Sequence, residues 1–569
     1  MLTRRDFLQV TAATALAMGG VGGLARTAAG QRISQESLLR FAPVGQLTLL
    51  HFTDLHAQLM PLYYREPSVN IGVGESLGLA PHLTGRRLLT EFGLQPGSPA
   101  AYAFCSEDFG ALAQEYGRVG GLDRMATLIK AIRAERPGAT LLLDGGDSWQ
   151  GSYSALMEQG ADMVEVTAAL GIDAMTAHWE FTYGAARVLE LKDRLKYPFL
   201  CGNVKDVTWG DPVFQAVQTF ERAGLKIAVI GQAFPYTPIA NPRWMIPDWS
   251  FGIDEEHLQG RVDKARREGA DLVVLLSHNG FDVDRKLAAR VHGIDVILTG
   301  HTHDAIPAPV IVGGTILIAS GSHGKFLARL DLKVAGRKVV EHRFALIPIF
   351  ADAIEPDPEV AALIERVRKP HLAKMSRVLG RTEGLLYRRG NFNGSFDDLI
   401  CQALLAEQDA EIALSPGFRW GASLLPGQEI TAEDLFAQTS ITYPAAYRTS
   451  MTGAYLKQVM EDVADNLFNP DPYLQQGGDM VRVGGIGYSI DVNQPMGSRI
   501  GDLTLERTGE AIAPGKQYRV AGWASVNQNT EGPPIYELVG RYIERQKLVP
   551  LPPAPRISVK GADPRGNAP

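Results

Sequence analysis

The feature that most constrains this chain is the recurrence of metal-ligand side chains where short apolar runs end. Apolar runs span 47–52, 140–143, 272–276 and 296–298, and aspartate or histidine follows each of them within a few residues. Runs of this length, bounded by turn residues, predict buried strands. The side chains at or near such strand ends are Asp54, His56, Asp147, His178, His278, His301 and His303. We therefore expect five loops to bring seven ligand-type side chains together.

Carboxylate oxygen and imidazole nitrogen are donors that divalent metal ions take in hydrolytic sites. Two cations about 3.5–4 Å apart can share a bridging carboxylate, activate a water molecule and stabilise an oxyanion. Taken singly, each motif also fits an ordinary loop histidine or a capping aspartate. The chain has 12 histidines, and five of them stand in these positions, so we expect a site for two metal ions.

The order of these motifs resembles that of the calcineurin-like metallophosphoesterases, and among them the 5′-nucleotidase family. The matching segments read DLH at 54–56, GGD at 145–147, AHWE at 177–180, SH at 277–278 and GHTH at 300–303. The resemblance covers roughly residues 46–545. It implies that Asp54, His56, Asp147 and His303 hold the first metal ion. It also implies that Asp147 bridges, and that His178, His278 and His301 complete the second site.

The third motif departs from the nucleotidase pattern. A nucleotidase carries Asn, His and Asp where this chain carries His178, Trp179 and Thr182. The resemblance therefore implies that Trp179 and Thr182 replace the catalytic His–Asp pair. An indole N–H donates one hydrogen bond, but it cannot act as a cation or proton donor as imidazole does. Ordinary phosphomonoester hydrolysis is thus not expected, although Trp179 is also compatible with a plain pocket wall.

The altered motif HWEFTYG at 178–184 resembles the SoxB family, as do GGDSWQGS at 145–152 and QQGGDMVRVGG at 475–485. That resemblance implies two Mn²⁺ ions, although the donors also suit zinc or iron. It implies hydrolysis of an S-thiosulfonate group on the carrier cysteine of the partner SoxYZ, with release of sulfate by attack of a metal-bound water during thiosulfate oxidation. A persulfide leaves more readily than an alkoxide, which fits the loss of the His–Asp pair.

Length and pattern predict the domain organisation. With 569 residues, 45% of them hydrophobic and 21% charged, the chain is long enough for two or more globular domains. Strand-like runs alternate with helix-like segments at 122–135, 161–170, 184–195, 255–269 and 285–291, which predicts an α/β fold. The resemblance implies a four-layer metallophosphoesterase-like sandwich at 46–350 and a linker helix at 351–379. A smaller α/β C-terminal 5′-nucleotidase-type domain at 380–548 and a loosely held Pro-rich tail at 549–569 complete the expectation.

The second domain of nucleotidases binds substrate. The segment GFRWG at 417–421 stands where that family has its GGIR loop, so the resemblance implies that Arg419 binds sulfonate oxygens through its guanidinium fork. The glycine-rich segment at 476–480 permits close backbone approach. Further substrate-binding candidates are Trp179, Gly478 and Asp479. A purine platform, which a nucleotidase needs, has Phe418 and Trp523 as its candidates.

The N-terminus reads TRRDFL at 3–8 and continues in a small apolar stretch at 10–25. It resembles a twin-arginine export signal at 1–30, which implies a periplasmic mature protein without a membrane anchor. A surface helix is the alternative. The net charge of −7 gives no indication of nucleic-acid binding.

The three cysteines predict no disulfide framework and no thiolate metal site. Cys201 and Cys401 lie in apolar stretches and are expected in the core, whereas Cys105 is an alternative candidate for a catalytic thiol. The long segment at 60–120 either lines a channel for the carrier arm or forms an ordered surface insertion. We expect His323 to stand behind the ligands or on the surface.

Two other functions remain open from the sequence. One is a periplasmic 5′-nucleotidase or cyclic-nucleotide phosphodiesterase, which a purine platform would favour. The other is a non-catalytic binding protein that keeps its metal ions for structure, against which the full set of seven ligands argues.

Overall fold

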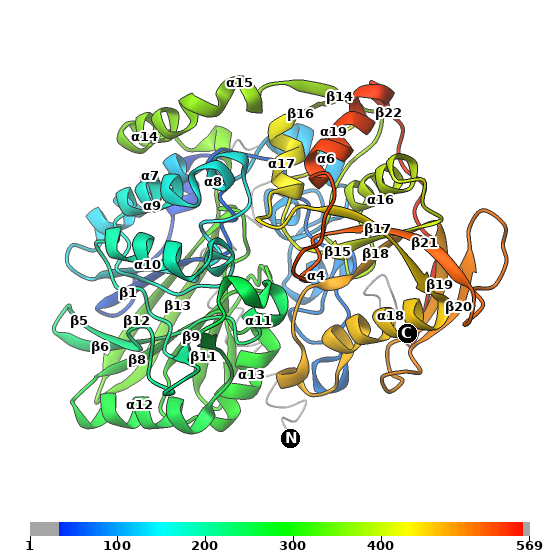
Figure 1. Ribbon diagram of the computed structural model, residues 1–569. Helices are drawn as coiled ribbons and strands as arrows, with labels where there is room; N and C mark the ends of the chain where they lie inside the picture. The colour runs from blue at the N-terminus through cyan, green and yellow to red at the C-terminus, as the bar shows by residue number, and fades with distance from the viewer. Residues whose placement is uncertain (1–32, 562–569) are drawn as a thin grey trace.

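The computed structural model describes residues 33–561, so the expected export signal at 1–30 lies outside the described residues. Figure 1 shows two α/β parts side by side, one formed by the chain up to about residue 350 and the other by the C-terminal third. Within 33–561, no helix is both long and apolar enough to cross a membrane.

Two sheets form the centre of the first domain. The first sheet has the strand order β13-β12-β1-β2-β3, and the second has the order β10-β11-β9-β8-β6-β5. Strands of the first sheet are β1 (Leu47–Phe52), β2 (Thr140–Asp144), β3 (Ala174–Met175), β12 (Phe326–Ala335) and β13 (Lys338–Pro348). Strands of the second are β5 (Val217–Arg222), β6 (Leu225–Gln232), β8 (Leu272–Ser277), β9 (Val296–Thr299), β10 (Val310–Val312) and β11 (Thr315–Ala319).

The strands that lead to the predicted ligands are parallel and buried along their whole length. β1 pairs in parallel with β2, and β8 pairs in parallel with both β6 and β9. Every residue of β1, β2, β8 and β9 is buried. Parallel strands covered on both faces need continuous apolar sequence, which is why these four runs are recognisable without alternation.

Helices cover the outer faces of the two sheets and complete a four-layer α/β sandwich, as predicted (Figure 1). They are α7 (Leu122–Glu135), α9 (Ala161–Ala169) and α10 (Ala185–Arg194) on one side, with α12 (Glu255–Arg267) and α13 (Phe281–Arg290) on the other. α13 begins earlier than expected. Its first turn contains Asp282 and Asp284, which favour a helix N-terminus but interrupt the apolar pattern.

The segment 60–120 is not a loop. It contains α4 (Gly85–Glu91), α5 (Pro99–Phe104) and α6 (Phe109–Tyr116). Tyr102 and Phe104 are buried in the main core of the first domain. The segment also reaches the second domain, because Tyr63 forms an isolated β-bridge with Ser423. It is therefore an ordered layer that joins the two domains.

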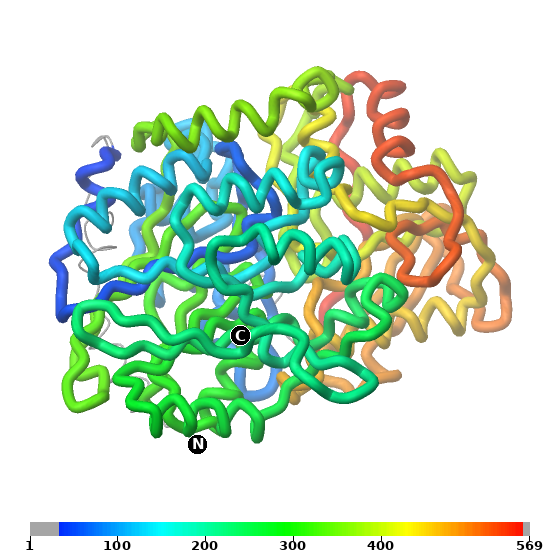
Figure 2. The backbone as a smooth tube through the Cα atoms, turned by 60° about the vertical axis from the view of Figure 1, so that its left-hand side comes forward, coloured from blue at the N-terminus to red at the C-terminus, as the bar shows by residue number. Residues whose placement is uncertain are grey.

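The linker, expected as a helix at 351–379, is helical but is interrupted at Pro370. α14 (Pro358–Arg368) ends in a 3₁₀ turn, η5 (Lys369–His371), before the short α15 (Leu372–Met375). Proline lacks the N–H that a continuous helix needs at this position. Figure 2 shows this segment crossing the top of the molecule from one domain to the other.

The second domain is built on a four-stranded sheet of order β17-β21-β15-β18. Its strands are β15 (Ile412–Gly417), β17 (Ala446–Thr452), β18 (Asp479–Gly484) and β21 (Gln517–Trp523). Ala413 and Ala521 belong to the core shared with α16 (Ser395–Glu407) and α19 (Ile535–Gln546). Ile412 and Val520 belong to the core shared with α18 (Gly453–Phe468). Both faces of the sheet are thus covered.

The chain after Pro550 corrects one expectation. Instead of a loose tail, Ile557–Lys560 forms β23, which pairs in parallel with β19 (Ile486–Asp491). The proline-rich stretch ends at Pro555, and the apolar side chains of Ile557 and Val559 then pack against the core of the second domain. The high proline content of this segment predicts irregular structure, and the alternating pattern of the strand is too short to be recognised beside it.

The hydrophobic cores cross the domain boundary. Ala422 and Leu425 of the second domain belong to the core of the first, whereas Trp179 of the first belongs to a core of the second. The two domains are therefore packed together through apolar contacts as well as through the linker.

Candidate metal centre

The seven predicted ligands meet where the buried strands end. Five of them, Asp54, His56, Asp147, His301 and His303, have positive φ angles between 46° and 75°. Left-handed backbone is uncommon for residues other than glycine and clusters at functional sites. Here it makes the chain turn sharply as it leaves a strand, so that side chains from neighbouring loops point to one place.

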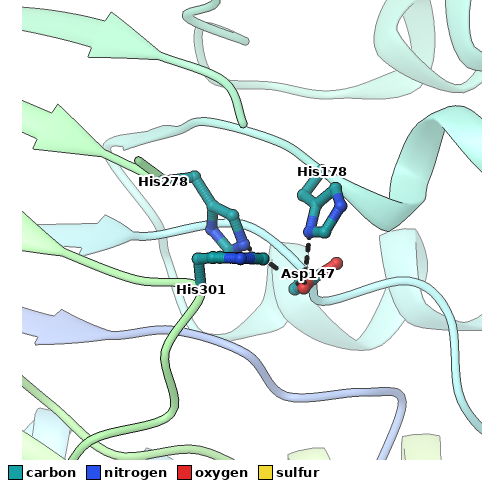
Figure 3. A group of neighbouring side chains, drawn as sticks. All are labelled: Asp147, His178, His278 and His301. Carbon is teal, nitrogen blue, oxygen red and sulfur yellow. Dashed lines mark hydrogen bonds and ion pairs between the residues drawn. The ribbon is translucent and has the colours of Figure 1, made fainter. Parts of the chain in front are cut away.

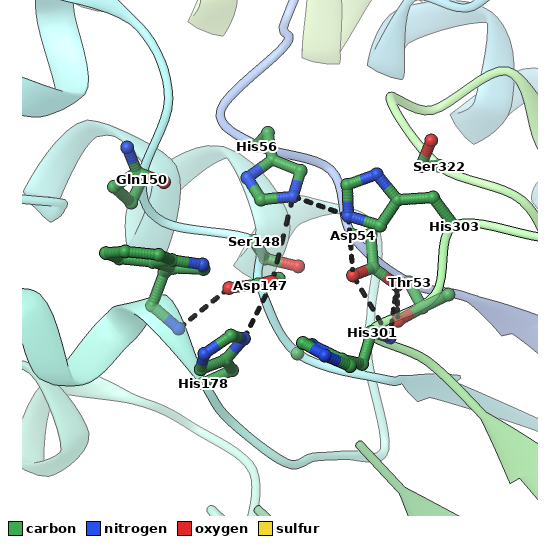
Figure 4. A network of polar contacts seen from close by, with 12 residues as sticks. Thr53, Asp54, His56, Asp147, Ser148, Gln150, His178, His301, His303 and Ser322 are labelled. Carbon is green, nitrogen blue, oxygen red and sulfur yellow. Dashed lines mark hydrogen bonds and ion pairs between the residues drawn. The ribbon is translucent and has the colours of Figure 1, made fainter. Parts of the chain in front are cut away.

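The ligands form two groups that share one residue. The first contains Asp147, His178, His278 and His301, and the second contains Asp54, His56, Asp147 and His303. Within each group the candidate ligand atoms lie within 4.8 Å of one another. Figure 3 shows the histidines of the first group around Asp147, and Figure 4 shows the same carboxylate beside the second group. Asp147 therefore stands at the bridging position, and each group has a donor set able to hold a metal ion.

Short distances connect the members of each group. Oδ2 of Asp147 lies 3.1 Å from Nδ1 of His178 and 3.2 Å from Nε2 of His278. Oδ1 of Asp54 lies 3.2 Å from Nε2 of His303. The same nitrogen of His303 lies 3.0 Å from Nε2 of His56. None of the seven residues is more than 9% exposed. Burying two carboxylates and five imidazoles together is costly without a cation, so these residues fit metal ions.

The electrostatics favour the ligand forms of His301, His303 and Asp147. Burial lowers the pKa values of His301 and His303 well below the usual range, which keeps both imidazoles neutral. Burial opposes ionisation of Asp147, but His178, His56 and His278 outweigh it and hold its pKa well below the usual range. Neutral imidazole and ionised carboxylate are the forms that bind metal.

Hydrogen bonds from neighbouring groups orient the ligands. The carbonyl oxygen of Gly145 lies 2.6 Å from Nδ1 of His278; since it can only accept, Nδ1 carries the proton and Nε2 is left to bind metal. The hydroxyl of Thr53 donates to Oδ2 of Asp54 at 2.7 Å. The backbone N–H of Trp179 donates to Oδ1 of Asp147 at 2.7 Å.

Glu180 is a supporting residue that sequence reasoning missed. Its buried carboxylate accepts the backbone N–H groups of His178 and Ser148, both at 2.7 Å. Burial raises the pKa of Glu180 to about 7, while these N–H donors favour its ionised form. It ties the loop of Asp147 to the loop of His178. The sequence signal for it is a charged residue inside an otherwise apolar, aromatic segment.

Arg389 was also missed, because it lies far from any ligand in the sequence. Its buried guanidinium donates from Nη1 to the carbonyl oxygen of Thr302 at 3.2 Å, between His301 and His303. An arginine of the second domain thus holds the loop that carries two of the predicted ligands.

A cavity of 260 Å³ opens above the predicted ligands. His56, Asp147, His178, His301 and His303 of the first domain line it together with residues of the second. The four predicted substrate-binding residues, Trp179, Arg419, Gly478 and Asp479, all line this cavity. The site therefore lies between the two domains, and both contribute to its wall.

Arg419 is held by two of its guanidinium nitrogens, so that the third is available as a hydrogen-bond donor. Nη2 donates to the carbonyl oxygen of Gly478 at 2.7 Å, and Nε lies 3.6 Å from Oδ1 of Asp479. Nη1 is buried and has no hydrogen-bond partner among residues 33–561. A buried N–H without a partner is a donor available to an oxyanion in the cavity.

The glycine-rich loop comes very close to a predicted ligand. A Cβ atom on Gly477 would lie 1.9 Å from Nε2 of His301, and the φ angle of Gly477 is +81°. Only glycine fits there, because any side chain would displace the imidazole. The close backbone approach expected for this loop is thus directed at the metal centre itself.

Trp179 and Thr182 have different surroundings. The indole of Trp179 packs edge-to-face against Phe418 and Trp420 on the wall of the cavity. Thr182 does not line the cavity, and its hydroxyl oxygen lies 2.6 Å from that of Thr442 in the second domain. Thr182 therefore connects the domains.

The aromatic residues proposed as a purine platform pack against one another. The Phe418 ring stacks on Trp420 at 4.0 Å and meets Trp523 edge-on at 5.7 Å. The indole N–H of Trp523 donates to the hydroxyl of Ser415 at 2.7 Å. Phe418 and Trp523 thus do not form two parallel faces between which a base would stack.

The cysteines lie outside this centre. Cys105, Cys201 and Cys401 are free thiols and all buried, so the core positions predicted for the last two are confirmed. Burial raises the pKa of the Cys105 thiol, which is the opposite of nucleophile activation. His323 is buried beside the ligands, with its ring centroid 5.4 Å from that of His56. It is therefore not a surface residue.

Comparisons with known proteins agree with this arrangement. A family model of the 5′-nucleotidase C-terminal domain matches residues 378–537. The sulfate thiohydrolase SoxB of Thermus thermophilus has a solved structure that matches with a TM-score of 0.88 at 37% identity, over 92% of this chain and 98% of that one. A 5′-nucleotidase precursor, also of Thermus thermophilus, matches in fold, with a TM-score of 0.71 at 20% identity over 91% and 100% of the two chains.

Curated sequences give a more distant similarity. The bovine (Bos taurus) 5′-nucleotidase is 25% identical over 447 residues, which cover 70% of this chain and 75% of the relative. The snake venom 5′-nucleotidase of Naja atra is 27% identical over 320 residues, and the match spans 50% of this chain and 59% of that enzyme's length. The fold class expected from the sequence, a metallophosphoesterase-like sandwich with a 5′-nucleotidase-type second domain, is confirmed.

Proposed function

The chain belongs to the SoxB family, within a superfamily of metal-dependent hydrolases that includes the 5′-nucleotidases, and on that premise we propose that it is an S-sulfosulfanyl-cysteine sulfohydrolase. Its substrate would be the S-thiosulfonate group on the carrier cysteine of SoxYZ, and its product sulfate. The observation that carries the proposal is the sharing of Asp147 by two ligand groups beneath a cavity that Arg419 and Trp179 line.

Two metal ions held by the seven ligands would activate water and offset negative charge on the substrate oxygens. Mn²⁺ is the ion we propose on the basis of the resemblance to the SoxB family, since carboxylate and imidazole donors by themselves also suit zinc or iron. Asp147 would stand between the two ions. Neutral His301 and His303 add no positive charge of their own, so the field at the site would come from the ions and from Arg419.

The chain's own residues would position the sulfonate. The free N–H of Arg419 donates to a sulfonate oxygen, while its bond to the Gly478 carbonyl keeps the guanidinium oriented. The aromatic side chains of Trp179, Phe418 and Trp420 exclude water from the part of the cavity wall that they form. No imidazole stands at position 179 to protonate a leaving group. A persulfide sulfur needs less protonation on departure than an alkoxide oxygen, so the substitution fits this leaving group.

We also propose export through the twin-arginine pathway and activity in the periplasm. The support is the TRRDFL segment followed by small apolar residues at the N-terminus. This pathway transports folded proteins, which suits a chain whose ligands are buried between two domains and would be loaded before export.

The test is sulfate release from SoxYZ bearing cysteine S-thiosulfonate by the manganese-loaded protein, run beside AMP hydrolysis. We expect sulfate release without AMP cleavage, and at least a roughly hundredfold loss in Asp147→Ala, since both ligand groups lose a member. Asp193→Ala, at an exposed aspartate of α10, serves as the matched control and should retain full activity. Rapid AMP cleavage without sulfate release would instead make the chain a nucleotidase.

A further inference from the structure

His323 connects the metal centre to the second domain. It lies in the turn between β11 and β12, and its backbone N–H donates to the carbonyl oxygen of Asp54 at 2.8 Å. Its ring is fully buried and stacks on Tyr64 with a centroid distance of 4.3 Å. The ring centroids of His56 and His303 lie 5.4 and 5.8 Å from that of His323.

Both ring nitrogens of His323 have partners. Nε2 accepts the backbone N–H of Gly421, 3.1 Å away in the second domain, and Nδ1 lies 2.8 Å from the hydroxyl of Ser322. A backbone N–H can only donate, so Nε2 must be the acceptor and the proton of the neutral ring stands on Nδ1. That proton is donated to Ser322, whose own hydroxyl donates to Oη of Tyr64 at 3.2 Å.

The partners of His323 are themselves fixed. The buried ammonium of Lys325 donates to the carbonyl oxygen of Tyr64 at 3.2 Å and to the carboxylate of Glu66 at 2.7 Å. The stack of Tyr64 on His323 is thus held from behind. This leaves the ring of His323 one orientation, with Nε2 directed at the second domain.

Gly421 ends the loop 417–421, which carries Arg419 and Trp420. Gly421 has φ +128°, and a Cβ atom there would lie 2.0 Å from Oε1 of Gln438. Gln438 also donates to the carbonyl oxygen of Ala422 at 2.7 Å. The loop is therefore held by Gln438 on the side of the second domain and by His323 on the side of the metal centre.

We propose that His323 is a positioning residue that places the loop carrying Arg419 over the metal centre, through the hydrogen bond from Gly421 to its Nε2. The role in substrate binding rests on the function proposed above, whereas the placement itself does not. His323 binds neither substrate nor metal in this proposal; it transmits the position of the Asp54 loop to the substrate loop.

The test compares His323→Phe and His323→Gln in the full-length, manganese-loaded chain. Phenylalanine keeps a ring against Tyr64 but removes both hydrogen bonds, whereas the glutamine side-chain oxygen can still accept the N–H of Gly421. Hydrogen–deuterium exchange of the amides at 418–424 and the metal content per chain are measured for each. His342→Phe, at a half-buried histidine on β13, is the matched control.

We expect His323→Phe to exchange roughly tenfold faster in this segment, as the loss of one buried hydrogen bond implies. His323→Gln should exchange at nearly the original rate, and all variants should retain two metal ions. Unchanged exchange in His323→Phe would overturn the proposal. So would equal acceleration in both variants, or loss of metal from His323→Phe, because His323 would then act through ring shape or through the ligands. None of these readouts requires sulfate release, so failure of the proposed function would be seen separately.

Discussion

At the scale of single residues, the metal centre depends on positions that only glycine can occupy as much as on the ligands. Gly477 and Gly478 have φ angles of +81° and +79°, but only Gly477 faces a ligand: a Cβ on Gly478 would find its nearest neighbour at 3.7 Å. Substitutions at Gly477 and Gly478 therefore distinguish the effect of backbone strain from the effect of contact with His301.

We expect Gly477→Ala to weaken metal binding at least roughly tenfold, because the new methyl group would displace His301. Gly478→Ala carries the same φ penalty, about 1 kcal/mol, without the contact, and should bind metal as the original chain does. Metal affinity measured by competition with a chromogenic chelator checks this. Equal weakening in the two variants would mean that strain in the loop, and not the approach to His301, governs binding.

Six of the seven ligands could be predicted from the sequence because they follow strands buried along their whole length, which leave continuous apolar runs ending in polar residues. His178 follows only the two-residue strand β3 (Ala174–Met175), and its motif was recognised through the family resemblance. Glu180, Arg389 and His323 could not be predicted in this way. Their roles depend on backbone groups from distant segments, such as the N–H of Gly421 or the carbonyl of Thr302, and side-chain chemistry alone does not indicate which backbone group will be near.

At the scale of elements, α16 begins with two aspartates of opposite character. Asp397 bonds Arg388 and Arg482, at 2.9 and 3.1 Å, inside the second domain. Asp398 is also buried, but its hydrogen-bond partner is the neutral amide of Asn393 at 3.2 Å. Burial, together with the charge of Asp397, raises the pKa of Asp398 to about 7.

Because the pKa of Asp398 is higher in the folded chain than in the unfolded chain, protonation of its carboxyl group stabilises the fold. This stabilisation is fully present below the pKa of the unfolded chain. This contribution is lost as pH rises from the ordinary aspartate range through about 7. We therefore expect Asp398→Asn, which is neutral at every pH, to be more stable than the original chain at pH 8 and closer to it at pH 5. Urea unfolding at the two pH values measures the difference.

A gap between the two proteins that is the same at both pH values would show that Asp398 keeps an ordinary pKa in the folded chain. The control is Asp397→Asn, which removes the carboxylate that buried Arg388 bonds and one of the two carboxylates that buried Arg482 bonds. It should destabilise the fold at both pH values, by about 3–5 kcal/mol.

Element boundaries followed the sequence where apolar runs were long. They failed where short-range signals competed, as at the acidic first turn of α13 and the Pro-rich approach to β23. The helices α4, α5 and α6 were hidden because the segment 60–120 is rich in glycine and proline, which punctuate the turns between them.

At the scale of the whole molecule, the two domains share cores and a site. Ala422 and Leu425 pack into the first domain and Trp179 into the second, so that separating the domains exposes apolar surface on both. We expect the metal-loaded chain to unfold in a single calorimetric transition whose midpoint rises with metal concentration. Two resolved transitions, of which only one responds to metal, would show that the domains unfold independently.

The relation between the domains was the part that the sequence did not predict. The motifs of each domain can be recognised separately, but nothing in either of them states that Arg389 reaches Thr302 or that Gly477 approaches His301. Such contacts join residues that are far apart in the sequence, and they depend on how two finished surfaces fit together.

The burial of all seven ligands between two domains also has a consequence for exchange. An ion bound there would face the cavity that Arg419 and the glycine-rich loop line, and it would leave when that loop opens. Its residence time would then be set by the frequency of that opening more than by the strength of the metal–ligand bonds. A chelator in solution would then remove the metal only as fast as the protein opens. The ion that was bound during folding would therefore remain bound.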